Sequence, residues 1–451
     1  MKRIFEKGQE GFDAEVARLA DRGLTETRSV EEPVRSIVAD VARRGDEALM
    51  EYTEKFDGIR LAPDEIRVPA EELERAWLSL PGEDRECLAL AAQRVRAFHE
   101  RQLDRSWFVE EEGVVLGQRL TALDSVGLYV PGGKAAYPSS VLMNAVPAQV
   151  ARVPRIAMVS PTPRGESNPY VWGAAWLAGV REVYRVGGAQ AVAALAHGTK
   201  TIPRVDKIVG PGNIYVATAK RLVYGVVDID MIAGPSEILV VSDGTGEPAH
   251  VAADLLSQAE HDEMATSVLV TTDRQFAERV AEEVERQLQE LPRGEMARQS
   301  WERRGGILVV QSPEEACGLA NRFAPEHLEL AVANPWEVLS FVRHAGAIFL
   351  GHHTPEALGD YAAGPNHVLP TAGTARFFSP LGVEDFVKRS SVIAFTQSAL
   401  ARLAPAVTKL ARLEGLEAHA RAVDLRVSEA PLETDSRSRH GAQSRDQPKD
   451  R

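Results

Sequence analysis

The sequence predicts an α/β protein with parallel sheets in two successive halves, a helical N-terminal unit and a helical C-terminal segment. From about Val114 onwards, short β-branched runs such as RIAMVSPTP and SEILVVSDG alternate with glycine turns and helical segments. A second alternation follows, with strand-like runs at SVLVTTD, GGILVV and GAIFLG. Strands that alternate with helices form parallel sheets covered by helices on both faces. We therefore expect two α/β domains in succession.

The first 110 residues predict a helical unit that forms part of a larger domain. Apolar residues recur at helical spacing from Glu32 to about Lys55, and the pattern stops at the turn signal Asp57-Gly58. A second helical stretch runs to about Leu103. Cys87 lies on its apolar pattern, so we expect this side chain in the core.

The remaining domain boundaries follow from the same alternation. We place the two α/β domains at residues 111–243 and 244–380, and expect a charged helix from Arg274 to Leu291 in the second. Residues 381–427 form a helical segment, with an interruption expected at Pro405. Residues 428–451 are polar and have too few apolar groups to offset the entropy of ordering, which predicts a disordered tail.

Length, charge and cysteine content limit the possible functions. At roughly 100–200 residues per domain, 451 residues predict several domains. The formal net charge of −13 argues against nucleic acid as the main partner. Two cysteines permit no disulfide framework, and the first residues contain no apolar secretory region, so we expect a cytoplasmic protein. The absence of a run of about 18 apolar residues argues against a membrane span.

Three glycine turns follow predicted strands, in GLYVPGGK, RVGGAQAV and KIVGPGNIYVATAK. Glycine lets a ligand approach the backbone, and the start of a following helix favours a phosphate group. A dinucleotide pyrophosphate would suit such a turn, although no turn has the G-x-G-x-x-G pattern. Glycine-rich turns also simply connect parallel strands, so both interpretations stay open.

The stretch SQAEHDE contains a candidate metal site. If it is helical, Gln258 and His261 are three residues apart and project from one face. Asp360, in a Gly/Pro-rich loop, and His419, near the end of the last helix, are candidates for the other ligands. Two histidines, one aspartate and one glutamine suit a cation such as zinc. A solvated helix face or a helix end is the alternative.

FAPEHLEL contains a candidate acid/base pair. Glu326 and His327 follow Pro325 at an expected helix or loop start. Both side chains have a pKa that a protein can bring close to neutrality, so they are suited to proton transfer. An exposed pair at a capped helix start is the alternative.

Taken together, these clusters resemble the histidinol dehydrogenase family. The resemblance covers about residues 30 to 425, which is nearly all of the chain except the tail. It rests on GLYVPGGKAAYPSSVLMNAVPA, VGGAQAVAALAHGT, VDKIVGPGNIYVATAKRLV, IDMIAGPSEILVVSD, DLLSQAEHD, FAPEHLEL, GAIFLGHHTPEALGDYAAGPNHVLPTAGTARFFSPLGVEDFVKR and LEGLEAHA.

The resemblance implies two incomplete Rossmann-like domains, a homodimer with shared active sites, and the NAD- and zinc-dependent oxidation of L-histidinol to L-histidine through the aldehyde. It implies Glu326 and His327 as the acid/base pair. The implied zinc ligands are Gln258, His261, Asp360 and His419. The implied NAD contacts are Tyr129, Gln190 and Asn213. The implied substrate contacts are Ser236, Gln258, His261, His327, Asp360, His367, Glu414 and His419.

Three other functions compete with this one. A relative with the same zinc and NAD sites could oxidise another hydroxyl compound, such as dihydroxypropane sulfonate, but Glu414 would repel a sulfonate. A zinc hydrolase could use Glu326 to activate water. A non-catalytic binding protein fits least well, because a complete set of candidate ligands and bases is present. An aldehyde step through a cysteine adduct is disfavoured, because neither Cys87 nor Cys317 lies in a matching motif.

Overall fold

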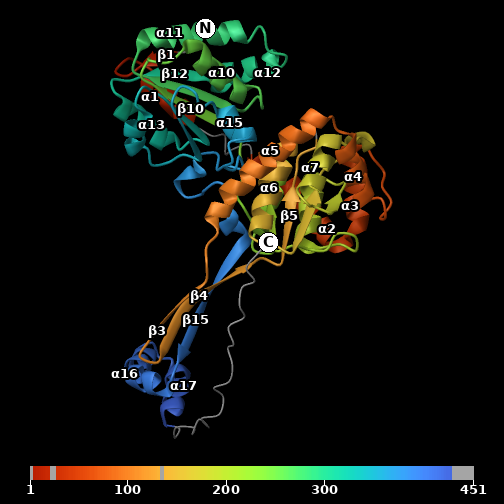
Figure 1. Cartoon of the computed structure of the whole chain (residues 1–451), viewed down its shortest axis with the longest axis vertical. Helices are drawn as coiled ribbons and strands as arrows, with labels where there is room; N and C mark the ends of the chain where they lie inside the picture. Colours follow the sequence, from red (N-terminus) through yellow and green to blue (C-terminus); the bar gives the residue numbers. More distant parts are fainter. Residues whose placement is uncertain (1–3, 21–26, 133–136, 429–451) are drawn as a thin grey trace, which may run out of the picture. The chain divides into compact units, whose positions relative to one another are not determined.

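Two six-stranded sheets, each covered by helices on both faces, form the main part of the described chain (Figure 1). The computed structural model describes residues 4–20, 27–132 and 137–428. The predicted α/β class with parallel sheets is confirmed. The expected tail at 428–451 lies almost entirely outside the described residues. Among the described helices, none combines the length and apolar character that crossing a membrane requires.

The first sheet has the strand order β2-β7-β6-β5-β8-β9. Its strands are β2 (Arg67–Val68), β5 (Ser125–Tyr129), β6 (Arg155–Val159), β7 (Glu182–Tyr184), β8 (Lys207–Val209) and β9 (Asp228–Ile229). The last five are parallel and, counted along the chain, have the Rossmann-like order 3-2-1-4-5. The short β2 is antiparallel to β7 at the edge.

Helices cover both faces of this sheet because side chains alternate along each strand. Val126 and Leu128 of β5 pack on one side, whereas Tyr129 packs on the other. The first side is covered by α4 (Ala70–Ser79), α5 (Gly82–His99), α6 (Pro138–Val150) and α7 (Pro169–Leu177). The second is covered by α2 (Thr27–Arg44), α3 (Asp46–Asp57), α8 (Gly188–His197) and α9 (Ile214–Val223). Short 3-10 turns are η1 (Glu100–Gln102) and η2 (Pro163–Gly165).

The second sheet has the order β1-β12-β11-β10-β13-β14 and is parallel throughout. Its strands are β1 (Ile4–Glu6), β10 (Glu237–Ser242), β11 (Thr266–Thr271), β12 (Gly306–Val309), β13 (His327–Ala331) and β14 (Ala347–Leu350). Its helices are α1 (Phe12–Ala20), α10 (Pro248–Ala259), α11 (Arg274–Gln287), α12 (Gly294–Arg304), α13 (Pro313–Phe323), α14 (Pro335–Val338) and α15 (Glu356–Tyr361). The 3-10 turns η3 (Leu339–Phe341) and η4 (Thr374–Arg376) follow in the chain, whereas η5 (Val383–Phe386) packs in the core of the first sheet.

This topology corrects the expected domain boundaries. We expected Glu237–Ser242 to close the first α/β domain, but this strand lies between β11 and β13 in the second sheet. The N-terminal unit is also divided, because Ile4–Glu6 pairs with β12 while α2 to α5 pack on the first sheet. The expected helix over 32–55 is two helices, since Gly45 has φ +61° between them. Cys87 is exposed, so its prediction as a core residue was wrong.

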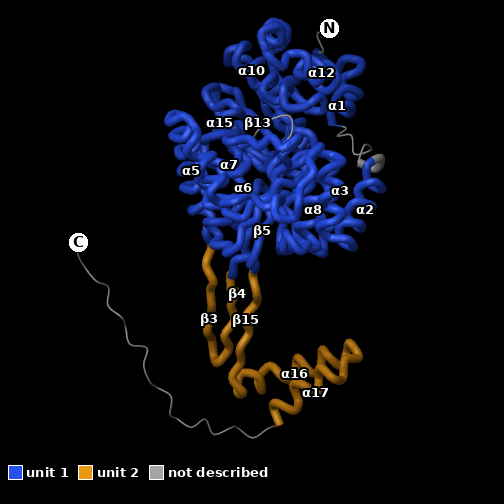
Figure 2. The backbone as a smooth tube through the Cα atoms, turned by 90° about the vertical axis from the view of Figure 1, so that its right-hand side faces the viewer, with its two compact units in different colours: residues 1–103, 121–388 blue, residues 104–120, 389–451 orange. Residues whose placement is uncertain are grey.

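Contact density separates a second compact unit from the rest of the chain (Figure 2). It comprises residues 104–120 and the chain from 389 onwards, and unit 1 comprises residues 1–103 and 121–388. This second unit, unit 2, contains β3 (Trp107–Glu111), β4 (Val114–Ala122), β15 (Val387–Phe395), α16 (Gln397–Leu413) and α17 (Glu417–Ser428). The expected helical segment 381–427 therefore also contributes a strand.

The interruption expected at Pro405 was also wrong. This proline lies inside α16, which continues to Leu413. The helix ends at Leu413, two residues before Gly415, which has φ +74°, and the Leu416 N–H donates to the Ala411 carbonyl over 2.8 Å. A glycine in this left-handed conformation ends a helix in the Schellman motif.

Candidate active site

Glu326 and His327 lie at the amino edge of the second sheet, beside the start of β10. Helix α13 ends at Phe323, and Ala324 adopts a left-handed conformation with φ +47°. The chain then enters β13 directly at His327, which lies opposite Ile238. We expected a helix or loop start here; the pair lies instead at the start of a buried strand. Both side chains are buried, so the exposed-pair alternative is excluded.

Backbone groups of Glu237 orient both candidate acid/base residues. The Glu237 N–H donates to Glu326 Oε2 over 2.9 Å, and the Glu237 carbonyl lies 3.0 Å from His327 Nδ1. Since a carbonyl can only accept, Nδ1 carries the hydrogen in this contact. His327 Nε2 faces Asp360 Oδ1 at 3.5 Å. The imidazole therefore directs its Nε2 towards Asp360, where it can accept or donate a proton.

The environment of the pair shifts both pKa values upwards. Burial raises the pKa of Glu326 to about 8, although the neighbouring His327 lowers it in part. Burial alone would lower the pKa of His327, but Glu326, Glu356 and Asp360 together raise it well above its ordinary value. A cation held at Asp360 would offset this negative charge and bring the pKa of His327 back towards neutrality.

A group of potential metal ligands lies beside this pair. One ligand atom each from His261, Glu356 and Asp360 lies within 4.8 Å of the others. Ligand bonds to zinc of about 2.0–2.2 Å place ligand atoms at such separations. Burial lowers the pKa of His261, which favours the neutral imidazole that binds metals. The residues present therefore fit one cation with nitrogen and oxygen ligands.

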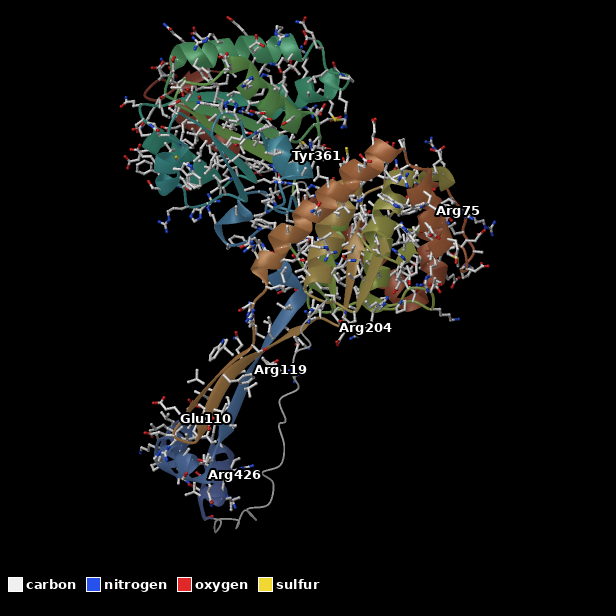
Figure 3. The ribbon with its side chains drawn as sticks, viewed as in Figure 1. Arg75, Glu110, Arg119, Arg204, Tyr361 and Arg426 are labelled. Carbon is white, nitrogen blue, oxygen red and sulfur yellow. The ribbon has the colours of Figure 1, made fainter. Side chains whose placement is uncertain are left out.

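Two local expectations about this group needed correction. Helix α10 ends at Ala259, so His261 lies in a turn just beyond the helix, and its N–H donates to the Gln258 carbonyl over 3.2 Å. Asp360 lies in the short helix α15, which we expected to be loop; Tyr361 at its end is labelled in Figure 3. The group forms because α10 and α15 contact each other.

Gln258 is buried beside Glu356 of this group. It is 1% exposed, which excludes the solvated-face alternative for this residue. The amide orientation that matches donors with acceptors directs Nε2 at both carboxylate oxygens of Glu356, at 2.7 and 3.2 Å. Oε1, the atom that could bind a cation, then points away from Glu356.

His367 and Ser236 are placed at the periphery of the acid/base pair and the metal group. His367 is partly buried, with Nδ1 2.8 Å from the Asp360 carbonyl and Nε2 3.3 Å from Ser140 Oγ. Burial lowers the pKa of His367, so the neutral imidazole is favoured. Ser236 immediately precedes β10, and its carbonyl accepts from the Thr266 N–H over 2.9 Å.

The residues expected to contact NAD lie at the carboxyl edge of the first sheet. Tyr129 ends β5, Gln190 lies in the first turn of α8, and Asn213 caps α9, its side chain accepting from two backbone N–H groups. Strands β5 and β8 flank the point where the strand order reverses, which is where such sheets bind ligands. The Gly188 N–H donates to the Tyr129 hydroxyl over 3.0 Å.

Gln190 has the clearest unfilled hydrogen-bonding capacity at this edge. It is 1% exposed, and neither polar atom of its amide has a hydrogen-bond partner among the described residues. Gly188 has φ +65°, and a Cβ there would lie 2.6 Å from Gln190 Oε1. Buried polar groups are normally paired, so this amide fits a site that takes a polar ligand.

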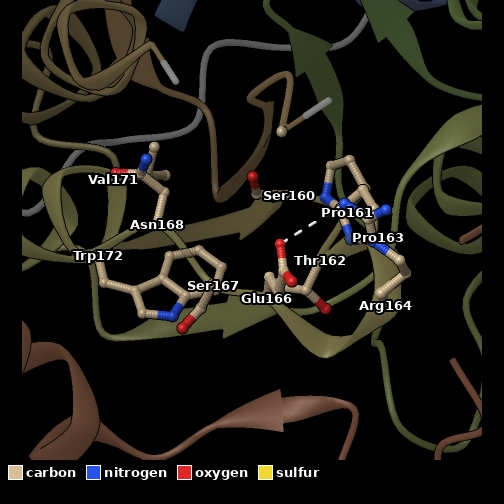
Figure 4. A pocket seen from close by; sticks show the side chains of 11 residues that line it. Ser160, Pro161, Thr162, Pro163, Arg164, Glu166, Ser167, Asn168, Val171 and Trp172 are labelled. Carbon is tan, nitrogen blue, oxygen red and sulfur yellow. Dashed lines mark ion pairs between the residues drawn. The ribbon is translucent and has the colours of Figure 1, made fainter. Parts of the chain in front are cut away.

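A cavity of about 230 Å³ continues the same edge (Figure 4). It lies beyond the end of β6, with an ion pair between Arg164 and Glu166 at 3.7 Å on its rim. Pro161 joins the cavity to the glycine turn before α8, since a Cβ on Gly187 would lie 2.5 Å from its ring. Its wall consists of Gly132, Ser160, Pro161, Thr162, Pro163, Arg164, Glu166, Ser167, Asn168, Val171 and Trp172.

Comparison with known proteins identifies the family. The family model described as histidinol dehydrogenase matches residues 20–427. Histidinol dehydrogenase of Geobacter sulfurreducens is 59% identical over 92% of this chain and 97% of its own. That of Aquifex aeolicus is 55% identical over 90% of this chain and 95% of its own. The chain belongs to the histidinol dehydrogenase family.

A solved histidinol dehydrogenase has the same fold. The crystal structure from Elizabethkingia anophelis superposes with a TM-score of 0.89 at 36% identity, over 94% of this chain and 98% of that one. The resemblance inferred from the motifs is therefore confirmed, and the chain is an enzyme of the family that catalyses the final steps of histidine biosynthesis.

Two of the predicted site residues lie in unit 2. Glu414 follows the last residue of α16, and His419 lies in the first turn of α17. Both are exposed in that unit. Their assignment as substrate contact and metal ligand stays a prediction, as do the roles of the other predicted histidinol dehydrogenase residues.

Glu356 was missed by the sequence interpretation. It is 1% exposed and belongs to the metal-ligand group. A signal was available, because Glu356 and Asp360 are four residues apart and share one face of a helix. We expected loop structure around Asp360, and in a loop that spacing carries no meaning.

Proposed function

We propose that this chain oxidises L-histidinol to L-histidine through L-histidinaldehyde, with reduction of two NAD molecules and with a bound zinc ion. The single observation that carries this proposal is the meeting of the acid/base pair with the metal-ligand group, since His327 Nε2 lies 3.5 Å from Asp360 Oδ1. Family membership supports the same reaction. The proposed setting is the cytoplasm, which suits the two free cysteines.

The proposed site has two parts. Gln258, His261 and Asp360 would hold the zinc, with His419 as the fourth ligand, and the bound ion would orient the amine and imidazole nitrogens of histidinol. Tyr129, Gln190 and Asn213 would hold NAD, which supplies the hydride acceptor in both oxidations.

His327 is the proposed base in alcohol oxidation. Its Nδ1 contacts the Glu237 carbonyl, so Nε2 is the nitrogen that can take the hydroxyl proton as hydride leaves the carbon. This oxidation converts the alcohol and NAD to the aldehyde, NADH and one proton.

Glu326 is the proposed base in aldehyde oxidation. The aldehyde must first add water, because the second hydride leaves from a tetrahedral carbon that carries two hydroxyl groups. Glu326 would remove the proton from that water, and its raised pKa of about 8 makes it a stronger base than an ordinary glutamate. Loss of the second hydride then yields the carboxylic acid.

The deciding experiment measures bound zinc and the ratio of NADH formed to histidinol consumed. We expect one zinc per chain and two NADH per histidinol. No NADH formation would favour the hydrolase or another hydroxyl substrate and would refute the proposal. In His261→Asn, zinc and turnover should be lost together while the circular-dichroism spectrum persists; a metal-free variant with full activity would remove zinc from the proposal.

We also propose a homodimer in which each active site takes Glu414 and His419 from the partner. Unit 2 supports this, because it exposes large apolar side chains that a partner surface would cover. Its exposed apolar residues include Trp107, Phe108, Val109, Leu116, Ile393, Leu410 and Leu413.

Subunit mixing tests the shared site. His261→Asn and His419→Asn should each be inactive alone, and co-expression should restore part of the activity, since mixed dimers would contain one intact site. If each chain formed its own site, no mixture would be active.

A further inference from the structure

Glu356 is a buried carboxylate that the proposed chemistry does not use. It begins α15, and the Glu329 carboxylate accepts its backbone N–H over 2.7 Å. The Ser257 hydroxyl donates to Glu356 Oε2 over 2.9 Å. The backbone of Glu356 is therefore held by Glu329 and its carboxylate by Ser257, within the metal-ligand group.

The Glu356 carboxylate in turn contacts the side-chain amide of Gln258. Nε2 lies 2.7 Å from one carboxylate oxygen and 3.2 Å from the other. An ionised carboxylate only accepts hydrogen bonds, whereas an amide has a donor end and an acceptor end. Glu356 therefore selects one of the two amide orientations of Gln258, the one that turns Oε1 to the opposite side.

This selection matters because glutamine is an uncommon metal ligand. The flipped orientation would present an NH₂ group, which cannot bind a cation. Groups that orient metal ligands through hydrogen bonds commonly contribute ten- to hundredfold to metal affinity. We propose that Glu356 is a positioning residue of the metal centre, which orients the Gln258 amide so that its oxygen faces the cation; this inference rests on the proposed zinc-dependent function.

The competing role for Glu356 is that of a direct ligand, since its carboxylate also lies within 4.8 Å of His261 and Asp360 ligand atoms. Both of its oxygens face hydrogen-bond donors, from Gln258 on both and from Ser257 on Oε2. This arrangement favours the positioning role, and the two roles predict opposite results in one experiment.

The experiment measures zinc affinity by competition with a chelator in the full-length protein. Circular dichroism and thermal unfolding of the metal-free protein check the fold. In the natural background, Glu356→Gln should weaken zinc binding ten- to hundredfold. In a Gln258→Glu background, Glu356→Gln should instead strengthen zinc binding. The amide introduced at position 356 then donates to the carboxylate introduced at position 258, which removes the repulsion between two carboxylates. Unchanged affinity in the natural background, or weakening in both backgrounds, would overturn the proposal.

Two further variants complete the test. Glu263→Gln removes one negative charge from an exposed residue near His261 and should leave zinc affinity unchanged. Ser257→Ala removes one of the bonds that hold Glu356 and should weaken zinc binding severalfold. If metal-free Glu356→Gln does not fold, Ser257→Ala decides the test. A larger loss of zinc affinity in Ser257→Ala than in Glu263→Gln supports the proposal, and an equal affinity in the two variants overturns it. Wild-type protein without zinc would refute the proposed function, whereas unchanged variants of a zinc-binding protein refute only the role of Glu356.

Discussion

The buried ion pair between Lys220 and Asp230 allows a quantitative test of how the fold holds the candidate NAD edge. Lys220 is 2% exposed, and its Nζ donates to Asp230 and to the Gly210 carbonyl, the latter over 2.9 Å. Asp230 accepts the backbone N–H groups of Gly210 and Met231 at 2.8 and 2.6 Å. The pair therefore holds the turn that leads to Asn213.

Lys220→Met should destabilise the protein, because it leaves the Asp230 carboxylate buried without its cation. Removing one partner of a buried pair costs about 3–5 kcal/mol. The lower value applies here, since two backbone donors still contact Asp230. With a urea dependence of about 3 kcal/mol per molar, a loss of about 3 kcal/mol lowers the unfolding midpoint by about 1 M.

The assay is urea unfolding, with NAD affinity measured by titration on the folded variant. Lys200→Met is the control, because Lys200 is exposed. We expect weaker NAD binding in Lys220→Met only, and combination with Asp230→Asn should lose less stability than the two single losses added. A midpoint no lower than that of the control, or strictly additive losses, would refute the reasoning.

Three further predictions concern protonation and the cysteines. The kcat/KM for histidinaldehyde should rise with pH and level off no higher than about pH 8. Burial raises the pKa of Glu326 to about 8, and a cation at Asp360 would lower this pKa. Glu326→Gln should remove the rise with pH, whereas a retained rise would assign it to another group. Burial raises the pKa of Asp57 to about 6, so the protonated carboxyl stabilises the fold and this contribution is lost as pH rises through 6. Asp57→Asn should therefore stabilise the protein by about 1 kcal/mol at pH 7, after allowance for partial exposure, but not at pH 4. Thermal unfolding measures this, and an equal change in Tm at both pH values would contradict the prediction. Replacing Cys87 and Cys317 with alanine should leave both oxidations intact. Cys87 is exposed on α5, and burial raises the pKa of the Cys317 thiol to about 11. Loss of aldehyde oxidation alone would favour a cysteine adduct.

The sequence predicted features that depend on neighbouring residues. The period of apolar residues located most strands and helices, and the charged helix expected from Arg274 begins at that residue. Glycine turns marked the carboxyl edge of the first sheet, and Tyr129, Gln190 and Asn213 lie there. Local chemistry was sufficient, because strand twist, helix spacing and turn conformation are decided within a few residues.

Residue spacing alone led to wrong predictions for features that depend on packing. Nothing within β10 specifies whether it pairs in the first or the second sheet, since parallel pairing joins segments far apart along the chain. Cys87 lies on an apolar pattern, yet that part of α5 faces outwards. Pro405 stays within α16 because the rest of a 17-residue helix continues around one missing hydrogen bond.

By itself, the sequence determined which groups are available for catalysis and the α/β class that carries them. Only the tertiary structure decided that Glu326, His327 and Asp360 lie together at one sheet edge. It also decided that the Glu356 carboxylate accepts hydrogen bonds from the Gln258 amide. The physical reason is that contacts between side chains of β13, α10 and α15 depend on how sheet and helices pack, and distances across a core are absent from residue spacing.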